Sequence, residues 1–121
     1  MQPQYKNLAA TDFWLAAHPD MAERVLKSLA EAEDFVARNP DETKAIVQKR
    51  LQYDEAYMAM AWPLTELSLF LDQSLITAME DEARWMMDND LTDERVVPDF
   101  LEYIYADALE SVKPGAVNII R

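Results

Sequence analysis

The sequence predicts a mainly α-helical fold with about six helices and one or two short extended segments. Its 121 residues are half hydrophobic and include a single Gly. Tight β-hairpins and phosphate-binding loops depend on Gly, because Gly reaches positive φ and permits close backbone approach. Helical periodicity recurs along most of the chain instead. The length suits one domain, and no linker or internal repeat divides it.

The charge and residue content exclude several classes of function. A net charge of −12 argues against nucleic acids and anionic membrane surfaces, which select for clustered Lys and Arg. There is no Cys, so disulfides and thiolate chemistry are excluded. No run of about 18 apolar residues is present to span a membrane. The start of the chain lacks the pattern of a secretory signal, so we expect a cytoplasmic protein if Met1 is the true start.

The first third of the chain predicts an extended stretch and two helices. Tyr5–Ala10 is expected to be extended, and Thr11 is suited to cap a helix over Asp12–His18. Pro19 ends that helix and can open the next one, which is expected to run to about Arg38. The buried side of this second helix is expected to comprise Met21, Val25, Leu29, Ala32 and Val36, with Leu26 and Phe35 beside them.

Two shorter helices and a second extended stretch follow. Asn39–Glu42 combines an N-cap, a Pro at the first position and an acid placed for a capping box, and so predicts a helix to about Leu51. Asp54 is suited to cap another helix, which ends at Trp62 because the next residue is Pro. Leu64–Leu71 alternates in part and is expected to be extended.

Leu71–Asp90 contains the longest and best-marked helix. Asp72 is suited to cap it, and Asn89 is suited to end it in a left-handed conformation. Glu80 and Arg84 have the spacing of an i,i+4 ion pair on its polar side. Its apolar side carries Leu75, Ile76, Met79, Ala83 and Met86.

The C-terminal part predicts a loop, a last helix and a tail. Leu91–Val97 is the loop, and the last helix opens near Pro98 and ends at Lys113–Gly115. Ala116–Arg121 is the tail. The broad apolar side of the last helix carries Phe100, Leu101, Ile104, Tyr105, Ala108, Leu109 and Val112.

Chemistry-bearing residues are few. His18 is the only His, and it lies at a helix end, where a cation favours the helix dipole. No nucleophile and base have the spacing of a catalytic dyad. We therefore predict no catalytic residue and no enzyme. Trp14, Trp62 and Trp85, with the Tyr and Met residues, could line a ligand pocket or a pliable binding surface, but core packing is the preferred interpretation.

An acidic segment resembles part of a calcium-binding loop. Asp88, Asp90 and Thr92 match positions one, three and five of that pattern. Its sixth position requires Gly and is Asp93 here, and its twelfth requires Glu and is Asp99 here. We therefore interpret the segment as a solvated acidic loop and predict no metal or other cofactor.

Four phrases of the chain together resemble a known family. They are LAATDFWLAAHPD, AEDFVARNPDETKAIVQKRL, LSLFLDQSLITAMEDEARWMMDNDLTD and VPDFLEYIYADALESVKPGAVNIIR. In this order they resemble the C-terminal part of periplasmic solute-binding proteins of ABC importers, the group that serves sulfonates, taurine, nitrate and thiamine-pyrimidine precursors. The resemblance covers nearly the whole chain, and LDQSL, EDEARW and DFLEYIY are its most specific parts.

The resemblance implies that residues 1–121 are a single partial domain, the C-terminal segment of one lobe of a two-lobed α/β protein. It implies a periplasmic location, a cognate ABC permease as partner, and small anionic or heterocyclic solutes bound only by the full-length protein. Tyr5–Ala10 then looks like a sheet strand without its usual neighbours. Thr11, at a strand-to-helix junction, is the candidate ligand-binding residue, beside its role as an N-cap.

A partial lobe leaves apolar helix faces and strand edges uncovered. We therefore expect a homo-oligomer, most simply a two-fold dimer. Two functions follow as alternatives. The first is a non-catalytic fragment or truncated relative of a solute-binding protein, and the second is a helical self-association or partner-binding module without ligand capture.

Overall fold

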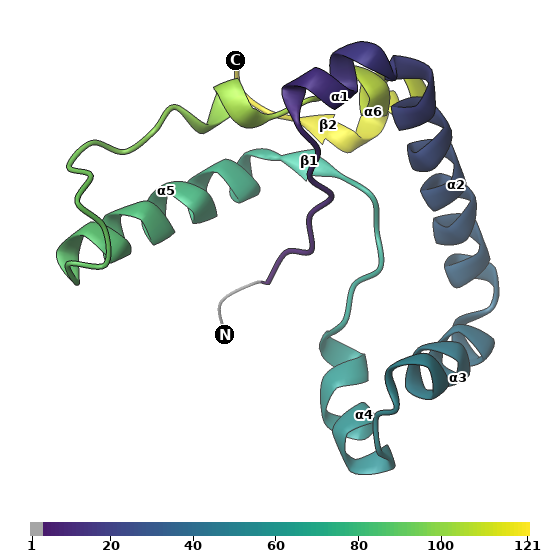
Figure 1. Ribbon diagram of the computed structural model, residues 1–121. Coiled ribbons are helices and arrows are strands. Elements are labelled where there is room, and N and C mark those ends of the chain that lie inside the picture. The colour runs from purple at the N-terminus through teal and green to yellow at the C-terminus, as the bar shows by residue number, and fades with distance from the viewer. Residues whose placement is uncertain (1–3) are drawn as a thin grey trace. The chain divides into compact units, whose positions relative to one another are not determined.

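The computed structural model describes residues 4–121, which are mainly α-helical and include one two-stranded parallel sheet (Figure 1). The expected cytoplasmic location depends on whether Met1 is the true start, and Met1 lies outside the described residues. The helices are α1 (Asp12–Ala17), α2 (Pro19–Arg38), α3 (Pro40–Leu51), α4 (Glu55–Ala61), α5 (Gln73–Asp88) and α6 (Asp107–Val112). Three short 3-10 helices are η1 (Trp62–Leu64), η2 (Phe100–Tyr103) and η3 (Pro114–Ala116). The strands are β1 (Leu71–Asp72) and β2 (Val117–Asn118).

The chain divides into two compact units. Unit 1 comprises Met1–Glu23 and Phe70–Arg121, and unit 2 comprises Arg24–Leu69. In unit 1, β1 pairs in parallel with β2, so that Leu71 is opposite Val117. The Ile120 backbone N–H also donates to Gln73 Oε1 over 3.0 Å, at the start of α5. The sheet thus joins two segments that are far apart in the sequence.

The buried hydrophobic residues lie mainly in unit 1. Two of them, Leu75 and Ile76, come from the first turn of α5, as the periodicity predicts. The others in this unit are Ala22, Ala106, Ala108, Leu109 and Ala116. Most of these side chains are small, so each buries little apolar area and contributes correspondingly little stability.

Unit 2 consists of the greater part of α2 with α3 and α4. Met58 is its buried hydrophobic side chain, and Thr43 is buried with its hydroxyl donating to the Asn39 carbonyl over 2.7 Å. Glu33 on α2 accepts a hydrogen bond of 2.6 Å from the backbone N–H of Leu69. This last bond holds the irregular chain after η1 against α2.

Capping residues confirm three predicted helix starts. The Thr11 hydroxyl accepts from the Trp14 N–H over 3.1 Å. Asp54 Oδ1 accepts from the Tyr57 N–H over 2.7 Å, and Asp72 Oδ1 accepts from the Ser74 N–H over 2.9 Å. Each short side chain satisfies a backbone donor that the first helical turn leaves free, which is why these helices begin where the sequence predicts.

The cap expected at Asn39 is wrong. Its side chain makes no capping bond to α3 and instead donates to the Phe35 carbonyl over 3.1 Å. Asn39 is the single residue between α2 and α3. Its amide therefore makes a second bond to the Phe35 carbonyl, which also accepts the Asn39 backbone N–H over 2.9 Å. The Pro at position 40 and the acidic first turn mark the start of α3.

The left-handed residue after α5 is also one position later than expected. Asn89 has φ −103°, whereas Asp90 has φ 54°. The Asn89 side chain donates to the Trp85 carbonyl over 2.8 Å, which keeps this residue on the helix end. The chain then turns at Asp90 and leads into the loop.

The last predicted helix is broken in the structure. Asp99 caps η2, Ile104 is extended at φ −100° and ψ 119°, and α6 begins only at Asp107. Aromatic and β-branched side chains from Phe100 to Tyr105 lose rotamer freedom in a helix, so helical periodicity is not enough to hold this stretch helical.

The predicted extended segments are only partly correct. Tyr5–Ala10 is not a sheet strand, and its most apolar residue, Leu8, is 70% exposed. Leu64–Leu71 begins in η1 and reaches a strand only at β1. Conversely, the tail Ala116–Arg121 contains β2. Strand pairing here depends on contacts between distant segments, which the local pattern does not contain.

The apolar side of α2 is much less buried than expected. Met21 is 43% exposed, Val25 42% and Leu29 38%. Phe35 is also exposed, whereas Val36 is half-buried. The periodicity correctly predicts the helix, but burial also requires a neighbouring element to cover the stripe.

Candidate functional site

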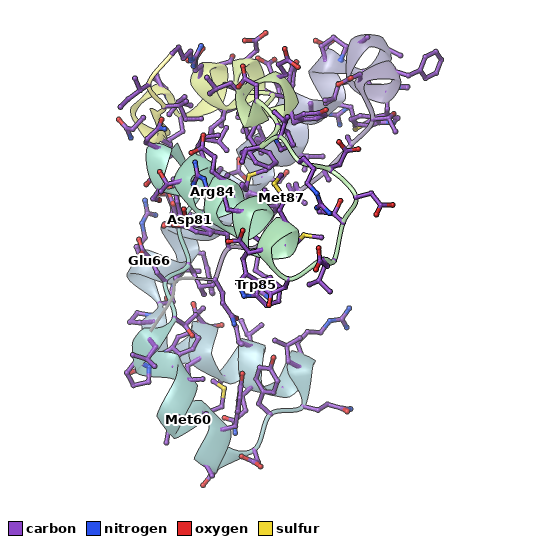
Figure 2. The ribbon with its side chains drawn as sticks, turned by 90° about the vertical axis from the view of Figure 1, so that its left-hand side faces the viewer. Met60, Glu66, Asp81, Arg84, Trp85 and Met87 are labelled. Atoms are coloured by element: carbon purple, nitrogen blue, oxygen red, sulfur yellow. The ribbon has the colours of Figure 1, made fainter. Side chains whose placement is uncertain are left out.

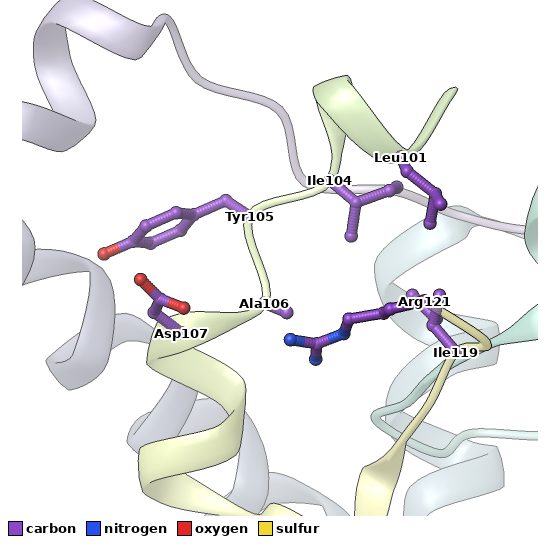
Figure 3. Close-up of a pocket in the computed structure, with 7 residues that line it drawn as sticks. All are labelled: Leu101, Ile104, Tyr105, Ala106, Asp107, Ile119 and Arg121. Carbon is purple, nitrogen blue, oxygen red and sulfur yellow. The ribbon is translucent and has the colours of Figure 1, made fainter. Parts of the chain in front are cut away.

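The candidate site is an open pocket of about 270 Å³ in unit 1 (Figure 3). It lies between the irregular segment that precedes α6 and the C-terminal residues that follow β2. Its lining comes from two stretches of the chain, residues 101–107 and residues 119–121. The lining residues are Leu101, Ile104, Tyr105, Ala106, Asp107, Ile119 and Arg121.

The polar groups of the pocket come from opposite sides of it. Figure 3 shows the Arg121 side chain reaching toward Ala106, with Tyr105 and Asp107 on the other side of the pocket. The Arg121 guanidinium forms an ion pair with Glu110, one turn into α6. Because that cation is already paired, the pocket does not present an unbalanced positive charge to an anionic solute.

The pocket can offer an apolar surface with a phenol, a carboxylate and a paired guanidinium at its edge. Its volume is close to the lower limit of ligand sites, which span about 300–1,000 Å³. It is open to solvent, and the side chains of Leu101 and Tyr105 are more than a third exposed. Burial of most of a ligand would require a second wall.

Thr11, the candidate ligand-binding residue, is not among the residues that line this pocket. Its hydroxyl accepts the Trp14 N–H bond that caps α1, and the residue is exposed. The Thr11 oxygen therefore has a capping role. A hydroxyl can accept this bond and still donate to a ligand.

His18 lies at the end of α1, as the sequence predicts. Its Nδ1 is 3.0 Å from the Trp14 carbonyl oxygen, which also accepts the His18 backbone N–H over 2.9 Å. The imidazole also stacks on the Trp14 indole, with ring centroids 4.9 Å apart and an interplanar angle of 25°. These contacts define a local structural role for the ring.

The residues of the calcium-like pattern have separate partners. Asp90 lies 3.6 Å from Arg95, and the Thr92 hydroxyl accepts from the Glu94 N–H over 3.2 Å. Asp99 accepts from the Leu101 N–H at the start of η2. Within residues 4–121, no group of three His, Cys, Asp or Glu residues is placed to hold a metal ion.

The aromatic and Met residues do not form a common core. Met58 is buried, but Trp85 is 57% exposed and Met60 65% exposed, so core packing was the wrong expectation for these two. Figure 2 shows Trp85 on α5, where Arg84 and Asp81 also lie. Arg84 pairs with Glu80 at 3.5 Å, as predicted, and also with Asp81 at 2.9 Å.

A hydrogen-bonded group at the start of α5 was not predicted. The Tyr5 hydroxyl donates to Ser74 Oγ over 2.8 Å, and the Ser74 hydroxyl donates to Asp72 Oδ1. The Tyr5 ring also meets Phe70 edge-on, with centroids 6.1 Å apart. Only the Asp72 cap has a local sequence signal, because Tyr5 reaches this helix from 69 positions away.

Comparisons with known proteins leave the family open. The chain matches no protein-family model, no curated protein and no solved structure. Within residues 4–121, no helix combines the length and apolar character that are needed to cross a membrane.

Proposed function

We propose that the chain is part of a solute-binding protein of an ABC importer and has no catalytic step of its own. The observation that carries this proposal is the parallel pairing of β1 with β2. Parallel strands occur almost only in α/β proteins, in sheets that helices cover on both faces. Two strands of two residues each are too short to be stable as a sheet by themselves. Such a pair fits the margin of a larger α/β lobe, as the sequence resemblance implies.

The open pocket also supports the proposal that only the full-length protein binds the solute. A cleft that captures a solute needs two opposing walls, and the pocket in unit 1 supplies one open surface. The proposal therefore assigns binding of small anionic or heterocyclic solutes to the full-length protein. It also implies a periplasmic location and delivery of the solute to a cognate ABC permease.

The gene itself provides the first test. We expect an uninterrupted reading frame upstream of Met1 that encodes a signal peptide and the remaining strands of two α/β lobes. A stop codon and a ribosome-binding site directly before Met1 would contradict the proposal. Fractionation of cells that express the full-length protein should then recover it from the periplasm.

Binding by the full-length protein provides the second test, with Thr11 as its probe. Thr11→Asp keeps a side chain that caps helices well, yet adds a negative charge. If Thr11 contacts an anionic solute, calorimetry with taurine, nitrate and a sulfonate should show at least about tenfold weaker binding by this variant. Thr11→Ser is the matched control, because it keeps both the cap and the hydroxyl. Equal affinity of all three proteins would assign Thr11 to capping alone.

The absence of a catalytic step is tested separately. His18 is the only His of the chain, and its Nδ1 faces the Trp14 carbonyl rather than a nucleophile. We expect no turnover when the purified chain is assayed for thiamine-pyrimidine synthesis. Reproducible activity that is lost in a His18→Ala variant would overturn this part of the proposal.

A helical self-association or partner-binding module is the second candidate function. The exposed stripe of α2 favours it, because a monomer rarely leaves a contiguous apolar helix face in water. A natural start at Met1 together with stable self-association would favour this candidate over the transporter part.

A further inference from the structure

The pocket in unit 1 contains one charge that no neighbour balances. Its two charged lining residues are Asp107 and Arg121. The Arg121 guanidinium already forms an ion pair with Glu110. The Asp107 carboxylate, at the first residue of α6, has no ion pair within residues 4–121. The pocket together with Glu110 therefore has an excess of one negative charge, and that charge is at Asp107.

The surroundings of Asp107 favour a cation. Tyr105 lies on the same side of the pocket, away from the wall formed by the C-terminal residues (Figure 3). The face of an aromatic ring attracts an ammonium group through its quadrupole. The net charge of −12 also attracts cations to the chain and repels anions. A positively charged ligand is therefore the better electrical match.

The rest of the pocket favours an apolar body on that cation. Leu101, Ile104 and Ile119 line it, and the two Ile side chains are half-buried. A cavity of about 150 Å³ is sufficient to hold benzene. The volume of about 270 Å³ therefore accommodates an aromatic ring with a short alkyl chain.

We infer that this pocket binds a small organic ammonium ion, with its ammonium group beside Asp107 and Tyr105 and its apolar body against Leu101, Ile104 and Ile119. Because the pocket is open and Asp107 is exposed, water screens the ion pair, and the expected affinity is millimolar. The inference concerns the 121-residue chain itself and does not rest on its proposed role in transport. The solute tests above use the full-length protein, so either idea can fail alone.

Three probes that share a phenyl ring and a two-carbon chain test the charge preference. They are 2-phenylethylammonium, the neutral 2-phenylethanol and the anionic phenylacetate. NMR titration of the whole chain should show saturable shifts of the backbone amides of residues 101–107 and 119–121, with a dissociation constant of about 1–10 mM for the ammonium probe. The alcohol should bind about threefold more weakly, and phenylacetate more weakly still. Equal binding of ammonium and alcohol, or no saturable shift at these residues, would overturn the inference.

Two matched variants test the place of the ammonium group. Asp107→Asn should weaken binding of 2-phenylethylammonium about three- to fivefold and change binding of the alcohol less than about twofold. Asp93→Asn removes the same charge from another exposed acid of unit 1 that does not line the pocket, and it should weaken the ammonium probe less than about twofold. Circular dichroism should show equal helix content in both variants, because both residues are exposed. Equal weakening in the two, or unchanged binding in Asp107→Asn, would overturn the assignment to Asp107.

Glu110→Gln tests the charge balance from the other side of the pocket. The change removes the partner of Arg121 and leaves the guanidinium charge uncompensated. Binding of 2-phenylethylammonium should then weaken at least about threefold, whereas binding of the alcohol should stay within about twofold. Unchanged binding of the ammonium probe would overturn the charge balance on which the inference depends.

Discussion

Unit 1 and unit 2 are stabilised by different kinds of contact. In unit 1, the β1–β2 pairing and the Ile120–Gln73 hydrogen bond join segments that are distant in the sequence. Seven of the eight buried hydrophobic residues in the described chain lie in this unit. In unit 2, Met58 is the eighth.

This difference indicates how each unit should unfold. Helices of the lengths of α3 and α4 are marginal in water without tertiary packing. Few buried apolar contacts also give a region low resistance to local opening. We therefore expect unit 2 to open before unit 1, and four substitutions test this expectation.

Leu109→Ala in α6 should have the largest effect. Leu109 is 2% exposed, and removal of a buried Leu side chain should lower the free energy of unfolding by about 3 kcal/mol. Urea denaturation followed by circular dichroism measures the loss. Leu101→Ala is the control, since Leu101 is more than a third exposed, and it should cost under about 1 kcal/mol. Equal costs would mean that α6 does not form the core of unit 1.

Met58→Ala should have a smaller effect that is confined to unit 2. Met58 is 3% exposed, and the loss of its side chain should cost about 2 kcal/mol. Hydrogen exchange should show faster exchange of the α3 and α4 amides, with the α5 and α6 amides unchanged. Faster exchange in all four helices would show that the two units open together, which would contradict the expectation that unit 2 opens first.

Asp54→Ala should cost about 1 kcal/mol, again within unit 2. The change removes the carboxylate that accepts the Tyr57 N–H at the start of α4. Asp54→Asn serves as the control, because Asn caps helices about as well as Asp. Exchange rates of the α4 amides measure the difference, and similar rates in both variants would argue against a capping role.

Gln52→Gly should have the smallest effect and the opposite sign. Gln52 ends α3 in the left-handed region, at φ 56°, where Gly is free of the strain that a Cβ introduces. We expect a gain of about 0.5–1 kcal/mol in unit 2, measured by the midpoint of thermal unfolding. Asp90→Gly makes the matching change in unit 1, at φ 54°. A loss of stability in both variants would contradict this interpretation.

The features that could be predicted from the sequence are those with local signals. The caps at Thr11, Asp54 and Asp72 and the Pro residues that open α2 and α3 are local signals, and they correctly predict five helices and the mainly helical fold. In unit 2 these signals account for the three α-helices. They work because capping and proline geometry involve only neighbouring residues.

Three features of unit 1 could not be predicted from local patterns. β2 directly follows η3 and carries only two paired residues, so no alternation marks it. The pocket depends on the break at Ile104, where aromatic and β-branched residues override an apparently helical pattern. Tyr5 reaches Ser74 across most of the chain. Each of these requires knowledge of which distant segments meet.

The placement of the three tryptophans gives the molecule a separate optical signal for each unit. Trp14 and Trp85 belong to unit 1, whereas Trp62, half-buried at the start of η1, is the tryptophan of unit 2. In a Trp14→Phe, Trp85→Phe double variant, all indole emission comes from Trp62. A red shift of that emission would then report hydration of unit 2 alone, on the timescale of a stopped-flow mixing experiment.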